Sequence, residues 1–361
     1  MRFIPPALDW TRICLCLVLF IAACHGNDAT LTRFEDSSAV DSMLTAAPHF
    51  VVNTDIDAET LVADEVLGFP NDSLILGRPR GLIAVTDTLY IVDQQYGSVL
   101  AIGPSGYLQR QIGRQGKGPG EFTNLWEIHY NGSNVFTYEE AKIQVFSENF
   151  NYVNSLTGAF RFRLGGIAVS PDFVLMQCPT KSNQVVCARS TSPPYAWLQS
   201  KQLLPVLELP DRSGENSYNV AISPHGNRIA VGYRGLPYIF IYDDHFVHLH
   251  TIRFEGKDVR DFEPTVGAPV PGVQESGTNV FISRIKFLDN NYLAARIFGT
   301  GTYVISVSDN RYQLEGKYAF RSVDDSQNEK NIHPSDMILH GDRLYVVSPF
   351  AEYVYGYNFE L

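Results

Sequence analysis

Residues 81–113 read GLIAVTDTLYIVDQQYGSVLAIGPSGYLQRQIG. Four short runs in this stretch are rich in aliphatic and aromatic residues, namely GLIAV, TLYIVD, SVLAIG and YLQRQI. The connections between them carry Thr-Asp, Tyr-Gly-Ser and Pro-Ser-Gly, which are residues that favour turns. The stretch therefore predicts four short strands joined by tight turns.

The same pattern recurs along the rest of the chain. We expect repeated units at approximately residues 80–113, 124–158, 165–204, 218–254, 280–320 and 334–361. Four-stranded units repeated at intervals of about 40–60 residues are typical of propeller blades. No long apolar segment with a helical period lies outside the N-terminus, which disfavours α/β folds. The sequence predicts an all-β fold, a six-bladed β-propeller of four-stranded blades over residues 59–361.

The sixth unit contains three strand-like runs instead of four: DMILH, RLYVVS and YVYGYNF. An unpaired edge in this blade would be an aggregation hazard. We therefore expect a strand from residues 59–76 to complete the last blade and close the ring.

The glycine-rich run IGRQGKGPGEF, residues 112–122, lies between the first and second units. Its composition is similar to that of phosphate-binding loops. A Walker loop, however, needs a Ser or Thr after the lysine and a helix behind it. Here Lys117 is followed by Gly118, and the next run is strand-like. We interpret the run as a junction in which glycine gives the backbone freedom to cross from one blade to the next.

This junction resembles that of NHL repeats, a glycine-rich run that ends in Gly-x-Phe. The matching residues are Gly116, Gly118, Pro119, Gly120 and Phe122. Tyr90-Ile91-Val92-Asp93 resembles the tyrosine-valine-x-aspartate of the same repeats. The chain is similar to bacterial six-bladed propeller lipoproteins, NHL-like or TolB-like, specifically over residues 79–148 and in pattern over 165–361. The resemblance implies little about a ligand.

The N-terminus predicts export. Arg2 and Arg12 precede an apolar run of about 11 residues, as in a signal peptide, and the run is shorter than the roughly 20 residues of a membrane-spanning helix. Ile21-Ala22-Ala23-Cys24 resembles a bacterial lipobox, so we expect a lipoprotein signal peptide over residues 1–23 and lipid on Cys24. An ordinary secretory peptide cut near Ala23 is the alternative. Residues 24–58 are expected to be a tether.

The net charge limits the classes of partner, and the cysteines agree with export. The net charge of -11 argues against a nucleic-acid partner, because phosphate binding needs a basic face. Cys178 and Cys187 lie on two runs that can pair as strands, which would set them directly opposite each other. We expect a disulfide there, since an exported protein meets oxidising conditions. Two buried free thiols are the alternative.

Propellers bind ligands where inner strands and loops converge on the axis. Eight residues fall near the predicted beginnings of inner strands: Arg80, Arg114, Lys117, Trp126, Arg163, Arg284, His333 and Asp336. Five of them are the candidate ligand-binding residues: Arg80, Arg114, Trp126, Arg284 and His333. Clustered arginines with an aromatic residue suit an anionic or carbohydrate-like ligand. The alternative is that each is a solvated loop residue or a structural ion pair.

Signals for catalysis and metal binding are weak. His248 and His250 have the spacing of a metal-binding pair, but we place them on an outer strand. There is no Gly-x-Ser-x-Gly nucleophile elbow. We assign no catalytic residue and predict no cofactor, with calcium or zinc left open.

Two classes of function follow. The first is a non-catalytic propeller anchored by its lipid to a membrane of the bacterial cell envelope, in the periplasm or on the outer surface. It would bind a protein, a carbohydrate or an anionic small molecule. The alternative is a hydrolase or lyase of the gluconolactonase or streptogramin-lyase type, with a metal in the central channel.

Overall fold

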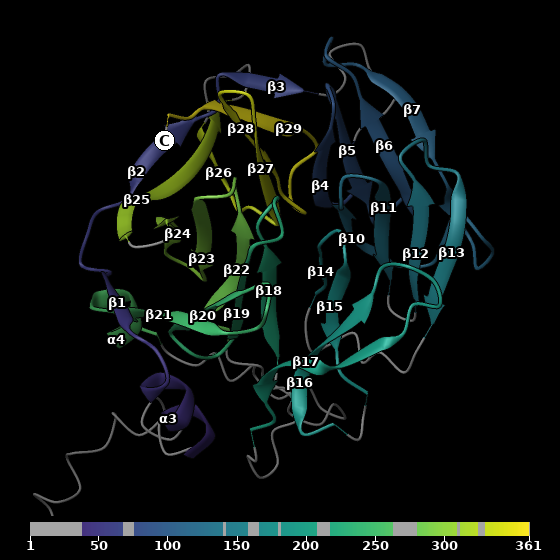
Figure 1. The fold of residues 1–361 in the computed structure, drawn as a ribbon. Coiled ribbons are helices and arrows are strands. Elements are labelled where there is room, and N and C mark those ends of the chain that lie inside the picture. Colours follow the sequence, from purple (N-terminus) through teal and green to yellow (C-terminus); the bar gives the residue numbers. More distant parts are fainter. Residues whose placement is uncertain are drawn as a thin grey trace, which may run out of the picture.

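The computed structural model describes residues 38–67, 76–139, 142–157, 166–179, 182–207, 217–262, 280–308, 311–323 and 329–360. Six sheets surround a central axis, each with its first strand innermost (Figure 1). The prediction of a six-bladed propeller is therefore confirmed. The expected signal peptide and Cys24 lie outside the described residues.

Blades 1, 2 and 3 are four-stranded antiparallel sheets whose strands follow the sequence order. Blade 1 consists of β4 (Pro79–Val85), β5 (Thr88–Asp93), β6 (Ser98–Ile102) and β7 (Leu108–Ile112). Blade 2 consists of β10 (Leu125–Tyr130), β11 (Asn134–Glu139), β12 (Lys142–Ser147) and β13 (Tyr152–Thr157). Blade 3 consists of β14 (Ala168–Val169), β15 (Phe173–Gln177), β16 (Gln184–Ser190) and β17 (Trp197–Pro205).

Blades 4, 5 and 6 are built in the same order from the axis outward, but each has an additional strand from the N-terminal segment at its outer edge. Blade 4 consists of β18 (Tyr218–Ile222), β19 (Arg228–Tyr233), β20 (Tyr238–Asp243) and β21 (His248–Glu255), followed by the short helix α4 (Lys257–Arg260). Blade 5 consists of β22 (Ile282–Phe287), β23 (Tyr292–Ile297), β24 (Gly301–Ser308) and β25 (Arg311–Val323), with β26 (Glu329–Ile332) folded back on β25. Blade 6 consists of β27 (Asp336–His340), β28 (Arg343–Val347) and β29 (Val354–Asn358).

The N-terminal segment supplies one strand to each of these three blades. β1 (His49–Asn53) pairs in parallel with β21, and β2 (Glu59–Val62) pairs in parallel with β25. β3 (Glu65–Leu67) pairs antiparallel with β29 and is the fourth strand of blade 6. The prediction that an N-terminal strand closes the last blade is confirmed. In Figure 1 the three strands follow one another along the outside of the ring.

The expectation of a tether over residues 24–58 is wrong for its described part. Residues Ser38–Thr45 form helix α3, in which Val40 is fully buried and Met43 and Leu44 pack on the core of blades 3 and 4. Val52 of β1 is also fully buried. The polar composition concealed an apolar helix face at positions i, i+3 and i+4 and a short strand, both of which fold because the propeller rim covers them.

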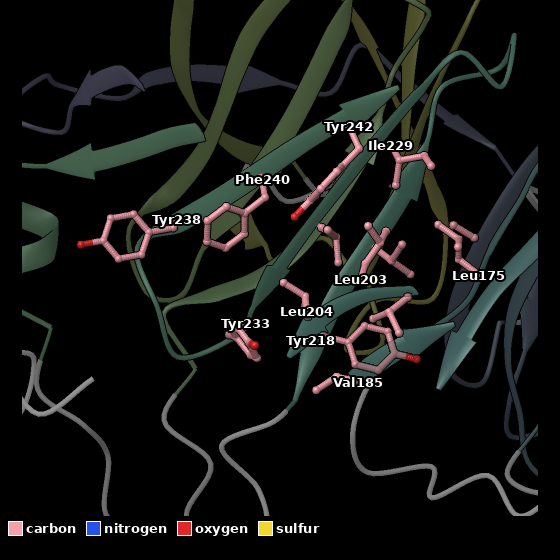
Figure 2. Close-up of a cluster of buried hydrophobic side chains, with 14 of the residues drawn as sticks. Leu175, Val185, Leu203, Leu204, Tyr218, Ile229, Tyr233, Tyr238, Phe240 and Tyr242 are labelled. Carbon is pink, nitrogen blue, oxygen red and sulfur yellow. The ribbon is translucent and has the colours of Figure 1, made fainter. Parts of the chain in front are cut away.

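The core consists of six hydrophobic clusters, one between each pair of neighbouring blades. Figure 2 shows the cluster between blades 3 and 4, where Leu175 of β15 lies with Tyr218 and Phe240 of blade 4. The cluster between blades 6 and 1 joins Val347 and Val354 to the inner strands of blade 1. Face-to-face packing of sheets thus continues around the whole ring, including the contact between blades 6 and 1.

Cys178 and Cys187 form a disulfide within blade 3, with 4.8 Å between their Cα atoms. The sequence suggested that the two cysteines lie directly opposite each other on paired strands. This detail was wrong. Cys187 faces Met176 in the register, and the Cys178 backbone N–H donates to the carbonyl of Val185. The bond therefore joins diagonal neighbours of the two strands.

The glycine-rich run is a junction between blades 1 and 2. Its ends form the short parallel pair β8 (Arg114–Gln115) and β9 (Glu121–Phe122). Gly113 has a φ of +76°, and a Cβ there would lie 2.3 Å from the ring of Phe122, which is fully buried. Only glycine fits this approach.

Candidate functional site

A cavity of about 690 Å³ opens at the axis, on the face where the inner strands begin. We call it the axial funnel. All six blades contribute to its wall, which contains the following residues: Arg80, Trp126, Glu127, Tyr138, Gly166, Tyr218, Asn219, Arg234, Val280, Ser283, Arg284, Arg296, Phe298, His333, Pro334, Ser335, Pro349 and Phe350. Its volume lies in the range of ligand pockets, about 300–1,000 Å³.

Blades 1 and 2 contribute a stacked pair to the funnel wall. The guanidinium carbon of Arg80 lies 4.7 Å from the ring centroid of Trp126, within the distance of a cation–π contact. Arg80 Nε donates to Gln94 Oε1 at 3.2 Å. Burial, with a smaller effect from the neighbouring charge of Arg78, lowers the pKa of Arg80 to about 10. The stack therefore holds a cation at the funnel wall in an environment that disfavours its charge.

Arg234 and Arg296 lie on the other side of the ring, in blades 4 and 5. Burial lowers the pKa of both. For Arg234 the charge of Arg284 lowers the pKa further, and the charge of Glu127 opposes this in part. Arg296 donates to the carbonyl oxygen of Pro334. Among the described residues, no ion pair involves Arg80, Arg234 or Arg296. The funnel wall thus carries three cations that contact no carboxylate of the described residues.

The bottom of the funnel is closed by four charged side chains, which we call the axial ion cluster: Glu127, Arg284, Lys286 and Asp336. Arg284 lies 2.5 Å from Glu127 and 3.6 Å from Asp336, and Lys286 lies 2.9 Å from Asp336. These side chains come from blades 2, 5 and 6. Their formal charges cancel, so the cluster does not offset the wall arginines.

The axial ion cluster also binds backbone groups of Leu82 and Ile167, which are buried at the inner edges of neighbouring blades. Asp336 accepts from the Leu82 backbone N–H, and Lys286 donates to the Leu82 carbonyl. Glu127 accepts from the Ile167 N–H at 3.0 Å. A Cβ on Gly166 would lie 2.4 Å from Glu127 Oε1, so a larger residue there would displace this carboxylate. The cluster therefore connects blades 1, 2, 3, 5 and 6 through ion pairs and hydrogen bonds.

Opposite charges determine the ionisation of the central pair. Burial raises the pKa of Glu127, but the charge of Arg284 and the hydrogen bond from His129 outweigh it and leave that pKa well below its usual range. Burial lowers the pKa of Arg284, yet Glu127 and Asp336 together raise it above its ordinary value. Both groups are ionised at neutral pH.

A second cavity of about 330 Å³ opens on the opposite face, and Arg284 borders both. Its wall is mainly aliphatic, with Ile83, Val220 and Ile338 among its members, and it contains His129 and His340. The axial ion cluster thus lies at the waist of the central channel. It separates an arginine-lined mouth from an aliphatic one.

The structure brings four of the five candidate residues together. Arg80, Trp126, Arg284 and His333 line the funnel. Arg114 does not, because it lies in the junction strand β8, where its side chain is 79% exposed and pairs with Glu121 at 2.7 Å. Its inclusion was wrong, since the glycine-rich loop turns it away before the inner strand begins.

Of the other residues that the sequence placed near the beginnings of inner strands, some lie at the axis and some do not. Asp336 belongs to the axial ion cluster, and Lys117 is not part of the funnel wall. Arg284 lines the funnel but is held in ion pairs, as the structural alternative proposed. Arg163 lies outside the described residues.

Sequence reasoning missed the residues that come from second strands and the loops after them. Arg234 follows β19, Arg296 is the penultimate residue of β23, and Phe298 and Phe350 follow β23 and β28. These loops lie on the same face as the blade junctions because each blade alternates direction from strand to strand. The repeat pattern marks where these loops lie in each blade, but their convergence on the axis depends on the angle between blades.

No group of three or more His, Cys, Asp or Glu side chains suited to a metal ion occurs among the described residues. His248 stacks on Tyr242, and His250 packs against Tyr312 of the next blade. No helix within the described ranges has the length and apolar character needed to cross a membrane.

Comparison with known proteins agrees with the fold. A family model described as a six-bladed beta-propeller (DUF5128) matches residues 70–160. No curated protein matches the chain. A member of the duf4221 family from Bacteroides vulgatus is similar in structure, with 10% identity and a TM-score of 0.51, over 83% of this chain and 97% of that one.

An inactive virginiamycin B lyase from Staphylococcus aureus, solved with quinupristin, is similar over 82% of this chain and 99% of that one. Its identity is 10% and its TM-score 0.50. These likenesses show the propeller fold and nothing about the ligand.

Proposed function

We propose that the protein is a membrane-anchored binding propeller of the bacterial cell envelope, and that its axial funnel captures an anionic small ligand. The observation that carries this proposal is the set of three wall cations, Arg80, Arg234 and Arg296, that contact no described carboxylate. Enclosed cations without counter-charges raise the local concentration of anions. They stand out more because the net charge of the chain is -11.

The chemistry of the wall suits carboxylate, phosphate or sulfate groups. Guanidinium groups present paired N–H donors that match two oxygens at once. The low polarity around these arginines, which lowers their pKa values, strengthens their attraction to an anion. A bound anion would supply the negative charge that the wall arginines lack in the folded protein.

The envelope location rests on the N-terminal sequence and on the disulfide. The apolar run and the lipobox-like Ile21-Ala22-Ala23-Cys24 support lipid anchoring through Cys24. The Cys178–Cys187 disulfide is consistent with an oxidising compartment. A hydrolase or lyase is not proposed, because Glu127 and Asp336 are bound to cations and backbone N–H groups.

Calorimetric titration of the soluble chain with inorganic phosphate, citrate and glucuronate tests the proposal, with glucose as the neutral control. We expect saturable binding of at least one anion, which weakens as ionic strength rises. Arg234→Gln should lower the affinity about tenfold or more, since charge-assisted hydrogen bonds are lost. Arg114→Gln, an exposed arginine outside the funnel, is the matched control. Equal losses in the two variants, or tighter binding of glucose than of glucuronate, would refute the proposal.

A further inference from the structure

Two phenylalanines are more than a third exposed among the described residues, and both line the axial funnel. Phe350 is 83% exposed and Phe298 is 56% exposed. Every other described phenylalanine is buried or half-buried. Leaving an aromatic ring in water forfeits the stabilisation that its burial would provide. Two such rings at one cavity point to a ligand surface.

The two rings hold equivalent places in neighbouring blades. Phe298 follows β23 in blade 5, and Phe350 follows β28 in blade 6, so each lies in the loop between the second and third strands. Arg296 is two residues before Phe298, at the end of β23. The rings therefore lie beside the wall arginines on one side of the funnel mouth.

A third aromatic surface faces the same cavity from blade 2. Trp126 is half-buried and carries the guanidinium of Arg80 on its ring. The funnel thus combines cations that would hold a charged group with aromatic surfaces that would hold a flat apolar body. A simple inorganic anion would use only the cations.

We infer that the ligand is amphipathic: an anionic group joined to a flat ring, with the charge held by Arg234 and Arg296 and the ring held by Phe298 and Phe350. This inference rests on the proposed function and deepens it. Recognition of the ring supplies selectivity that charge alone lacks, because any anion can enter a cationic funnel. Preformed aromatic walls with a few placed polar groups are the usual composition of small-molecule sites.

The test compares 1-naphthyl phosphate with inorganic phosphate and with neutral 1-naphthol, by calorimetric titration of the intact soluble chain. We expect 1-naphthyl phosphate to bind at least about tenfold more tightly than either of the others. Phe298→Ser and Phe350→Ser should each weaken 1-naphthyl phosphate several-fold and leave inorganic phosphate unchanged. Arg234→Gln should weaken both phosphates.

The matched control is Tyr107→Ser, which removes a ring that is 53% exposed but outside the funnel. It should leave all affinities unchanged. Equal affinity for the two phosphates, or Phe variants that behave like Tyr107→Ser, would overturn this inference while the anion-binding function stands. Failure of both phosphates to bind, or binding that Arg234→Gln does not weaken, would overturn the proposed function itself.

Discussion

A guanidinium nitrogen of Arg284 in blade 5 lies 2.5 Å from a carboxylate oxygen of Glu127 in blade 2, although 157 positions separate them in the sequence. Both side chains lie at the waist of the central channel, where Glu127 also accepts the Ile167 N–H. The pair therefore has a structural role in joining blades across the axis. It leaves the other funnel arginines to meet a ligand.

The first prediction concerns this pair. Glu127→Gln should lower the free energy of unfolding by about 3 kcal/mol, because removing one partner leaves a buried charge poorly compensated. Urea unfolding measures it. Glu121→Gln is the control, since Glu121 pairs with Arg114, whose side chain is 79% exposed, and such a surface pair should contribute far less to stability. Similar losses in the two variants would contradict the structural role.

The second prediction is a pH dependence. Folding lowers the pKa of Glu127, so its contribution is fully present above the ordinary carboxyl pKa of about 4.3 and is lost as pH falls below that value. Unfolding free energies at pH 6, pH 4.5 and pH 3 should therefore fall more steeply for the natural protein than for Glu127→Gln. Parallel curves would show that this carboxylate is not selectively stabilised in the folded state.

The third prediction concerns the N-terminal segment. Val52 is fully buried and its neighbour Val51 is 49% exposed. Val52→Asp should cost several kcal/mol, roughly 3 or more, because it buries a charge without a partner. Val51→Asp makes the same change in net charge and should stay within about 0.5 kcal/mol. If thermal unfolding shows equal effects, β1 is not part of the folded unit.

The fourth prediction concerns the anchor. Cys24→Ser removes the thiol that would carry lipid in the lipobox-like motif. Metabolic labelling with a radioactive fatty acid should then be lost, and the protein should move from the membrane to the soluble fraction. Labelling that persists in Cys24→Ser would refute lipid attachment at this residue. If the natural protein is not labelled at all, the ordinary secretory peptide is favoured.

The fold could be predicted because each blade is encoded locally. Strand-like runs and turn residues repeat over short distances, as in GLIAV and TLYIVD, and an absent fourth strand in blade 6 indicated that another segment must close it. The strands β1 and β2 were missed because they add to blades that are already complete. Nothing in a short run such as His49–Asn53 shows which distant edge will pair with it.

The site was predictable only where it follows the inner strands. Arg80 and Trp126 lie at the beginnings of inner strands and do line the funnel. Arg114 precedes the inner strand β10 by 11 residues, where the direction of a side chain depends on the path of the glycine-rich loop. Arg234 and Phe350 come from loops between second and third strands, and their convergence depends on the angle between blades, which no local pattern reveals.

Trp126 lines the axial funnel and can therefore report directly whether the funnel is electropositive and attracts anions. The chain has three tryptophans, Trp10, Trp126 and Trp197. Removing the predicted signal peptide and making Trp197→Phe would leave Trp126 as the single tryptophan, which can be excited selectively over the tyrosines. Its quenching by iodide, caesium and neutral acrylamide would then be compared with that of free tryptophanamide.

Relative to acrylamide, iodide should quench Trp126 several-fold more strongly than it quenches the free compound, because the local potential concentrates anions. Caesium should quench Trp126 less strongly than it quenches the free compound. Arg234→Gln should reduce the iodide preference, and Arg114→Gln should leave it unchanged. If the ratio of iodide quenching to caesium quenching equals that of free tryptophanamide while acrylamide quenches normally, the funnel is not electropositive.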